Sequence, residues 1–381
     1  MEQLKLPGSL PELLEELKAE GVPEVQYHRW ISRYLSLKAR ERGIPYTGTF
    51  ELTPLCNLDC KMCYVHLTAE QMQGAQLLST AQWKALMAQA IDAGMRKARL
   101  TGGECLTYPG FEELYLYLHS RGIEVMVLTN GVLLDERRID FFRKHPPCEI
   151  QVTLYGSDED AYQRVTGRRM FRRVWENLQR ANAAELPVTI AITPSRFMEP
   201  DADALLDRAE ELGLPYDINF GLYDPREDTG REAGTVLDTS LETYIHLYKR
   251  KRAFQGRELT PVDERELPTP GTSRDPAKGV RCAAGRGMFE IDWTGTMYGC
   301  TNLRSVSARP LEIGVAESWR RIHAGVQEIP VPSECVDCVY APICVVCPAA
   351  HEQKGSMAHC NTVYCQRVRR MVAEGLSTLP D

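Results

Sequence analysis

The feature of this sequence that most constrains its fold is a regular alternation of short β-forming runs with amphipathic helical segments. Six runs rich in β-branched and aromatic residues have the character of strands. We expect strands at residues 49–52, 98–101, 123–129, 149–155, 188–193 and 216–222. Strands that alternate with helices pair in parallel, because a parallel pair needs a long crossover. The pattern therefore predicts an α/β fold, a partial (β/α)6 TIM-like barrel that is closed or nearly closed, with its chemistry at the carboxyl ends of the strands.

Helix signatures fill the gaps between these runs. The clearest is a capping box at Ser79–Gln82, after which apolar residues recur at helical spacing as far as Gly94. Comparable patterns predict helices near residues 111–121, 135–144, 171–184, 201–212 and 241–254. Two further helices, at about 10–21 and 24–42, precede the first strand, and we expect them to form a small helical preface.

Composition divides the chain into four segments. They are a helical preface at 1–46, the barrel at 47–255, a linker at 256–281, and a cysteine-rich region with a C-terminal helix at 282–381. The linker contains many proline, glycine and charged residues and has no apolar period. The cysteine-rich region opens with the pattern of a β-hairpin at 288–300, which turns at Thr294-Gly295.

Charge and hydropathy argue against two kinds of partner. The 381 residues carry a formal net charge of −7, so the surface as a whole does not attract nucleic acid or anionic lipid. No apolar run approaches the roughly 18 residues of a membrane-spanning helix. The first residues are polar and acidic and lack the pattern of a signal peptide, so we expect a cytoplasmic protein.

The 13 cysteines are unevenly distributed. Three of them, Cys56, Cys60 and Cys63, come directly after the first predicted strand, and eight more lie between Cys282 and Cys365. Disulfide bonds explain this distribution of cysteines poorly, because thiols in the cytoplasm stay reduced and an odd number of cysteines cannot all be paired. Spacings such as Cys-x2-Cys are typical of metal sites. The sequence therefore predicts metal binding.

Two kinds of metal site remain open for the first three cysteines. A structural zinc ion needs four protein ligands, and His66 is the nearest candidate for the fourth. A [4Fe–4S] cube held by three cysteines instead leaves one iron free to bind a small molecule. The spacing favours the iron–sulfur cluster without excluding zinc.

Two motifs in this order resemble those of one family. Cys-x3-Cys-x2-Cys after the first strand, followed by Thr101-Gly-Gly-Glu104 after the second, resembles the radical S-adenosylmethionine (SAM) enzymes over residues 47–250. The resemblance implies that the free iron chelates the amino and carboxylate groups of SAM. Reduction would then break the sulfonium C–S bond, and a 5′-deoxyadenosyl radical would abstract a substrate hydrogen. It also implies an external electron donor of the flavodoxin or ferredoxin type.

The resemblance further assigns residues to the SAM site. They are Met62, Gly102, Gly103, Glu104, Thr153 and Ile190. The glycines would let the backbone approach the methionine moiety of SAM, and the glutamate would meet its ammonium group. The methionine and isoleucine would pack near adenine, and the threonine would lie near the ribose. A purely structural role stays open for the strand residues, because buried strand positions have the same composition. No catalytic residue is assigned.

The C-terminal cysteines resemble the SPASM extension of peptide-modifying radical SAM enzymes. Their spacing is Cys-x12-Gly-x4-Cys and then Cys-x2-Cys-x5-Cys-x2-Cys, where the family usually has x3 at the last step. The resemblance implies two auxiliary clusters, and thus three [4Fe–4S] clusters in the chain. The outer cluster would be held by Cys335, Cys338, Cys344 and Cys365. The inner cluster would be held by Cys282, Cys300 and Cys347, with Cys360 or an open iron as the fourth position. Whether Cys360 or Cys365 completes the outer cluster stays open.

The leading hypothesis for function is a radical SAM enzyme that oxidatively crosslinks side chains of a ribosomally synthesised peptide, because SPASM regions are associated with peptide substrates. A sulfatase-maturing role is less favoured, since those enzymes carry an aspartate base where this chain has Thr301. The first alternative is a radical SAM dehydrogenase or tailoring enzyme acting on a small metabolite. The second alternative is a non-enzymatic iron–sulfur or zinc scaffold.

Overall fold

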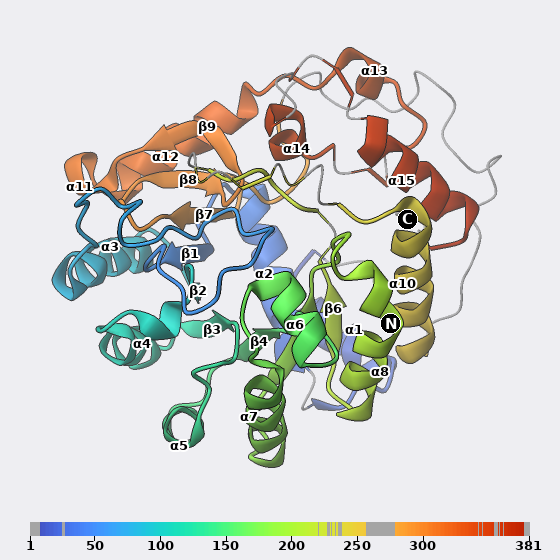
Figure 1. Cartoon of the computed structure of the whole chain (residues 1–381). Coiled ribbons are helices and arrows are strands. Elements are labelled where there is room, and N and C mark those ends of the chain that lie inside the picture. Colours follow the sequence, from blue (N-terminus) through green and yellow to red (C-terminus); the bar gives the residue numbers. More distant parts are fainter. Residues whose placement is uncertain are drawn as a thin grey trace.

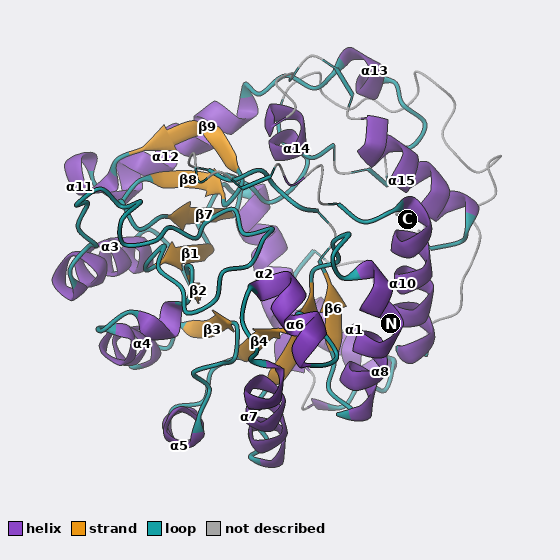
Figure 2. Ribbon diagram, viewed as in Figure 1, coloured by secondary structure: helices purple, strands orange, loops and turns teal. Residues whose placement is uncertain are grey.

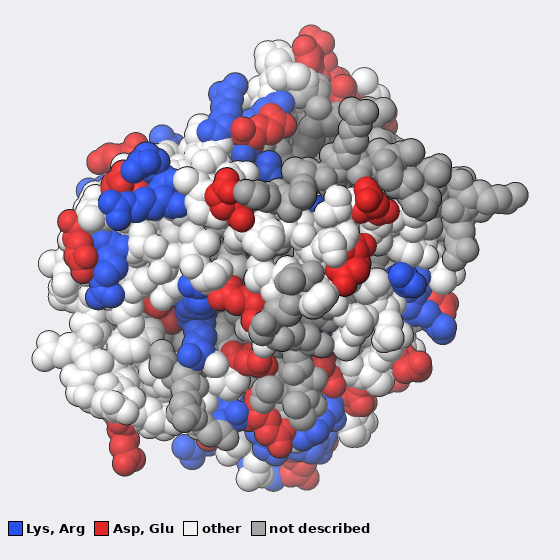
Figure 3. Space-filling model, turned by 90° about the horizontal axis from the view of Figure 1, so that it is seen from above, with Lys and Arg blue, Asp and Glu red and all other residues white. Residues whose placement is uncertain are grey.

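Figure 1 shows the computed structural model of the chain. The residues that it describes are 8–24, 27–219, 221–226, 229, 231–232, 234, 238–256, 279–341, 343–344, 346–353, 357, 359–360 and 362–376. Residues 257–278 of the predicted linker lie outside them. Across the described ranges, no helix is both long enough and apolar enough to span a membrane. Acidic and basic side chains are interspersed on the face seen in Figure 3.

One mixed sheet organises the structure (Figure 2). Its spatial order is β6-β5-β4-β3-β2-β1-β7-β8-β9. The strands are β1 (Thr47–Glu51), β2 (Lys97–Thr101), β3 (Glu124–Thr129), β4 (Glu149–Thr153), β5 (Val188–Ile192), β6 (Tyr216–Ile218), β7 (Met288–Ile291), β8 (Met297–Cys300) and β9 (Leu303–Ala308). All pairs from β6 to β7 are parallel, whereas β8 pairs antiparallel with β7 and β9. The six predicted strands and their parallel pairing are confirmed.

The sheet does not close into a barrel. Strand β1 pairs with β2 on one side and with β7 on the other, so β1 has no free edge for β6. The predicted hairpin is present as β7 and β8, and its turn holds Gly295 at φ +83°, which favours glycine. Strand β9 was not predicted. The sheet thus continues across residue 282, where composition suggested a boundary, and the four-segment division stays a prediction.

Helices pack outside the parallel strands, where α3, α4, α5, α7 and α8 surround the curved sheet (Figure 1). The helices are α1 (Leu10–Ala19), α2 (Tyr27–Glu41), α3 (Thr80–Asp92), α4 (Phe111–His119), α5 (Glu136–Lys144), α6 (Glu159–Thr166), α7 (Phe171–Ala183), α8 (Ala202–Glu211), α10 (Leu241–Phe254), α11 (Pro310–Ile313), α12 (Val315–Gln327), α13 (Ser333–Val336), α14 (Pro348–Gln353) and α15 (Thr362–Ala373). The capping box of α3 forms as predicted, since Ser79 Oγ accepts from the N–H of Gln82 at 3.3 Å. Helix α6 was missed because it is short and follows β4 closely.

A row of aromatic rings joins the parallel strands to the hairpin. Phe50 of β1 packs edge to face on Trp83 of α3 and on Phe289 of β7, with ring centroids 6.1 and 6.0 Å apart. Phe289 in turn contacts Trp319 of α12 at 6.3 Å. Edge-to-face pairs add to the hydrophobic gain from burying the rings. The first and last thirds of the chain therefore share one core.

The packing of this core predicts that replacing a buried leucine by alanine lowers the free energy of unfolding more than replacing an exposed one. Leu86 of α3 is fully buried, so Leu86→Ala should lower the free energy of unfolding by about 2–5 kcal/mol. Leu116 of α4 is 37% exposed, so Leu116→Ala should change it by less than about 1 kcal/mol. Urea unfolding of both variants, followed by circular dichroism, checks this. Equal losses would show that α3 does not pack as the structure has it.

Candidate functional site

Three cysteines after β1 line one cavity at the carboxyl edge of the sheet. Cys56, Cys60 and Cys63 face a cavity of about 240 Å³. The loop turns tightly, because the N–H of Cys63 donates to the carbonyl of Cys60 at 3.0 Å. The N–H groups of Leu58 and His66 donate to Sγ of Cys56 and Cys63 at 3.4 and 3.2 Å. Such donors favour the thiolate and tune an iron–sulfur cluster. The loop therefore presents three thiols to one space.

Burial keeps these thiols protonated in the absence of a cation. It raises the pKa of Cys56 to about 12 and also raises the pKa of both Cys60 and Cys63 above the ordinary thiol value. Iron bound by the sulfurs would replace the protons with positive charge and so offset the cost of burying thiolates. The donor set thus fits a cationic inorganic group, and loading it would release protons.

His66, the alternative fourth ligand for zinc, is engaged by its neighbours. Its Nδ1 lies 3.0 Å from Nη2 of Arg231 and 3.4 Å from Oδ1 of Asp59. Burial, and then the positive charge of Arg231, lowers the pKa of His66. Among the described side chains, no three Cys, His, Asp or Glu groups converge closely enough to chelate a single metal ion. Zinc ligation through Nδ1 would require these contacts to break.

The glycine-rich loop after β2 closes against the cysteine loop. The N–H of Gly103 donates to the carbonyl of Thr53 at 2.7 Å. A Cβ at Gly102, whose φ is +152°, would lie 2.4 Å from that carbonyl oxygen, and a Cβ at Gly103 would lie 2.4 Å from the carbonyl oxygen of Leu55. Both glycines also line the cavity. The missing side chains therefore allow the two loops to touch, which the sequence analysis had ascribed to the approach of a ligand.

Glu104 faces β3 and does not line the cavity. Its carboxylate, 1% exposed as a residue, accepts from the N–H of Leu106 at 3.0 Å, from Oγ1 of Thr129 at 2.8 Å and from the N–H of Asn130 at 2.8 Å. Burial raises the pKa of Glu104, and these hydrogen bonds oppose the rise. The side chain thus joins the ends of β2 and β3. Its predicted contact with the SAM ammonium stays a prediction.

The remaining residues predicted to bind SAM differ in whether they line the cavity. Met62 and Thr153 line the cavity. Ile190 does not, because its register partner across the β4–β5 pair is Val152, and both are fully buried in the core. Side chains alternate along a strand, so the face of Thr153 continues at Ala191, the neighbour of Ile190. The assignment of Ile190 to the adenine wall is therefore not supported, because its side chain lies on the core face of β5.

Several polar residues of the cavity were missed by the sequence analysis. They are Gln151, Thr193 and Asn219, which come from β4 and from the ends of β5 and β6. Strict alternation from Thr153 would have found the glutamine. Asn130, which directly follows β3, donates through Nδ2 to Oδ1 of Asn57 at 2.6 Å and thereby ties the end of β3 to the cysteine loop.

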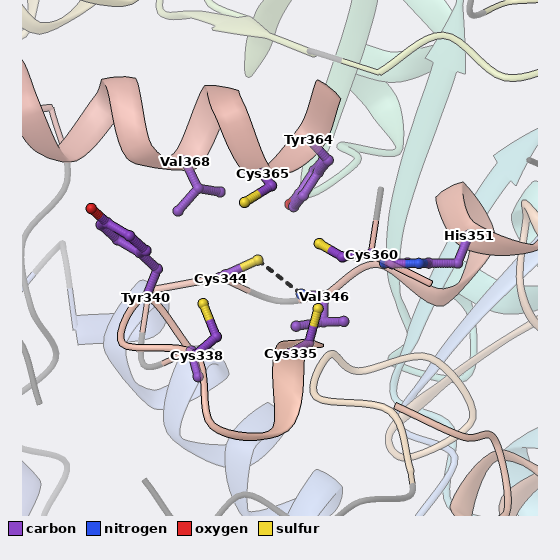
Figure 4. Close-up of a pocket in the computed structure, with 11 residues that line it drawn as sticks. Cys335, Cys338, Tyr340, Cys344, Val346, His351, Cys360, Tyr364, Cys365 and Val368 are labelled. Carbon is purple, nitrogen blue, oxygen red and sulfur yellow. Dashed lines mark hydrogen bonds between the residues drawn. The ribbon is translucent and has the colours of Figure 1, made fainter. Parts of the chain in front are cut away.

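The outer C-terminal cysteines surround a second pocket (Figure 4). The five thiols that line it belong to Cys335, Cys338, Cys344, Cys360 and Cys365. The N–H of Val346 donates to Sγ of Cys344 at 3.4 Å. Burial raises the pKa of Cys360, which interacts with the thiols of Cys335 and Cys365. Both candidates for the fourth outer ligand therefore line this pocket, and the choice between them, like the place of Cys360 in the inner group, stays a prediction.

The inner group consists of Cys282, Cys300 and Cys347. Burial raises the pKa of Cys300 to about 11, and the neighbouring Cys282 and Cys347 thiols raise it further. Cys300 ends β8, and Cys347 directly precedes α14. The three inner cysteines therefore come from separate parts of the chain, and their ligation of one cluster stays a prediction.

Part of the chain matches a known family of domains. Residues 50–209, which run from β1 into α8, match the sequence model described as the Radical SAM superfamily. Among solved structures, Streptococcus suis SuiB bound to precursor peptide SuiA has a TM-score of 0.65 at 18% identity, over 87% of this chain and 79% of that chain. The TM-score shows that the two proteins share a fold, and an identity of 18% shows no more than that.

Two curated relatives cover much of the chain. It is 26% identical over 264 residues to the sporulation killing factor maturation protein SkfB of Bacillus subtilis, over 67% of this chain and 62% of SkfB. It is 23% identical over 322 residues to the AdoMet-dependent heme synthase of Methanosarcina barkeri, over 80% of this chain and 91% of that protein. The chain thus spans less than two thirds of the length of SkfB.

The contacts of Glu104 predict that its charge supports the fold of the cavity edge. Glu104→Gln places an N–H group against at least one backbone or hydroxyl donor, so it should lower the free energy of unfolding by roughly 1–3 kcal/mol. SAM binding should weaken as a consequence. Thermal unfolding and SAM titration of the same samples check both. The exposed Glu136→Gln is the matched control, with a change within about 0.5 kcal/mol. Unchanged stability with weaker SAM binding would instead support direct contact with the ammonium.

Proposed function

Because this chain contains a radical SAM domain, we propose that it is a radical SAM enzyme with three [4Fe–4S] clusters that oxidatively crosslinks a ribosomally synthesised peptide in the cytoplasm. One observation carries the proposal. Three thiols from the loop after β1 and two glycines from the loop after β2 line the same cavity at the carboxyl edge of the sheet. A scaffold protein would not need a cavity beside its thiols that is large enough for a cofactor.

The chain's own residues have separable roles in this proposal. Cys56, Cys60 and Cys63 hold three irons of a cluster and leave the fourth facing the cavity. The polar side chains of Gln151 and Thr153 offer hydrogen bonds to the ribose and methionine parts of SAM. When bound and reduced by an external flavodoxin- or ferredoxin-type donor, SAM supplies a 5′-deoxyadenosyl radical. Exclusion of water from the loaded cavity would protect a radical from side reactions.

The peptide substrate is supported by two relatives and by the auxiliary cysteines. SkfB is named as a maturation protein, and SuiB was solved with a precursor peptide. The inner and outer cysteine groups supply sites for two further clusters, and oxidative bond formation needs an electron acceptor after hydrogen abstraction. Crosslinking is therefore the chemistry that uses all three cysteine groups.

A small-metabolite substrate is the second candidate. The AdoMet-dependent heme synthase matches over 80% of this chain and 91% of its own length, more than SkfB on both counts. A metabolite enzyme would cleave SAM in the same cavity but would leave co-expressed peptides unchanged. The identity of the substrate, rather than the radical chemistry, separates the two candidates.

Mass spectrometry of short peptides encoded beside the gene, co-expressed anaerobically with the protein, tests the proposed function. We expect the modified peptide to lose the mass of two hydrogen atoms for each crosslink, and 5′-deoxyadenosine to accumulate. Cys56→Ala should abolish both, because it removes a predicted iron ligand. Cys148→Ala is the matched control, since Cys148 is exposed and does not line the cavity.

Two kinds of result would count against the proposed function, and the experiment tells them apart. Unmodified peptides with normal SAM cleavage would favour the metabolite enzyme. Zinc as the dominant metal, or SAM cleavage that survives in Cys56→Ala, would contradict the radical SAM assignment itself.

A further inference from the structure

Residues 221–226, which follow β6, form a segment that we call the bridging segment. The N–H of Arg226 donates to the carbonyl of Tyr64, next to the cysteine loop, at 3.1 Å. The N–H of Asp224 donates to Oε1 of Gln353 in α14 at 3.3 Å. The bridging segment therefore contacts both the loop that carries the three cysteines and the cysteine-rich region.

Arg226 anchors the bridging segment by buried ion pairs. Its Nη1 lies 2.6 Å from Oε2 of Glu51 at the end of β1, and its Nη2 lies 3.2 Å from Oε1 of Glu290 in β7. Nη2 also donates to the carbonyl of Thr301 at 2.8 Å. Both carboxylates are almost fully buried, and burial raises the pKa of Glu51 to about 7 although Arg226 opposes the rise. Removing the guanidinium would break the ion pair of the buried Glu51 and leave Glu290 with its longer contact to Arg304 at 3.7 Å, so the segment is firmly placed.

Tyr223 of the bridging segment lies between the cavity and the inner cysteine group. Its side chain lines the cavity with Cys56, Cys60 and Cys63, and its ring packs edge to face on that of Tyr64 with centroids 6.2 Å apart. Its hydroxyl oxygen lies 3.9 Å from Sγ of Cys347 in the inner group. This separation suits an O–H···S hydrogen bond, because sulfur is larger than oxygen. One side chain thus spans the distance between the cavity and an auxiliary thiol.

The direction of this hydrogen bond is fixed once iron is bound. A free thiol can donate or accept, but a thiolate that ligates iron has no proton and can only accept. The phenol hydroxyl of Tyr223 is then the donor. Hydrogen bonds to cluster sulfurs stabilise the reduced, more negative cluster and so raise its reduction potential.

We propose that Tyr223 is a positioning residue that donates a hydrogen bond to the Cys347 thiolate and thereby makes the inner auxiliary cluster a better electron acceptor for the cavity that the same ring lines. This inference rests on the proposed function. A substrate C–H bond breaks as its hydrogen atom passes to the 5′-deoxyadenosyl radical. The substrate radical then forms the new bond with the attacking side chain, which releases a proton to solvent. One electron passes to the oxidised [4Fe–4S]²⁺ inner cluster, giving [4Fe–4S]⁺, which an external acceptor reoxidises.

An EPR-monitored redox titration of Tyr223→Phe tests the proposal, because the variant keeps the ring and removes only the hydroxyl. The hydrogen bond to the thiolate is stronger when the cluster is reduced, and a difference of about 1 kcal/mol between the two oxidation states means that loss of the hydroxyl should lower the equilibrium constant for reducing the inner cluster about fivefold. That is a shift of about 40 mV toward negative potential, since tenfold corresponds to 59 mV for one electron. Crosslinked product per 5′-deoxyadenosine should also fall.

Tyr340→Phe is the matched control. Tyr340 lines the outer cysteine pocket, so its loss should leave the inner potential unchanged. If Tyr223→Phe fails to load the inner cluster, 3,5-difluorotyrosine at position 223 keeps the ring and strengthens the donor, and the potential should then shift in the positive direction. The proposal is overturned if the potential of the inner cluster is unchanged in Tyr223→Phe. If that variant does not load the cluster, an unchanged potential in the 3,5-difluorotyrosine protein overturns it. A wild-type protein that cleaves no SAM refutes the proposed function instead, and the potentials still decide the role of Tyr223.

Discussion

The parallel pairing of β1 with both β2 and β7 is the constraint on which the rest of the site depends. Parallel strands end at the same edge of a sheet, so the loops that follow β1 and β2 are brought together there. The same pairing joins β7, and through its hairpin Cys300, to the sheet whose first strand leads into the cysteine loop. The β1–β7 pair therefore helps to fix the position of the cysteine-rich region relative to the cavity.

Close contact between loops then converts this arrangement into a cavity of defined shape. Glycines at 102 and 103 let one loop lie on the carbonyl groups of the other, and Asn130 and Glu104 tie the end of β3 to the same edge. On the opposite side, Arg226 holds the bridging segment through buried carboxylates of β1 and β7. Buried ion pairs and hydrogen bonds of this kind are costly when incomplete, so they specify one arrangement of the loops.

Local signals in the sequence predicted the local parts of this structure. Capping residues, helical periodicity and strand runs placed the six parallel strands and the hairpin, because each depends on neighbours within one element. The pairing of β1 with β7 was not predictable, since it joins segments more than two hundred residues apart. Motif resemblance identified the cysteines and glycines as residue types. It did not give side-chain direction, so Ile190 was assigned to the cavity although its strand face is the core, and Glu104 was not expected to face β3.

The central claim is that an open iron on Cys56, Cys60 and Cys63 faces a cavity that holds SAM. Electron–nuclear double resonance on the reduced, reconstituted protein tests it most directly, with SAM labelled by ¹⁵N at the amino group and ¹³C at the carboxylate. We expect hyperfine coupling of both labels to the reduced cluster, lost when the three cysteines are replaced by alanine. A reduced cluster at these cysteines, saturated with SAM but uncoupled to either label, would contradict the account.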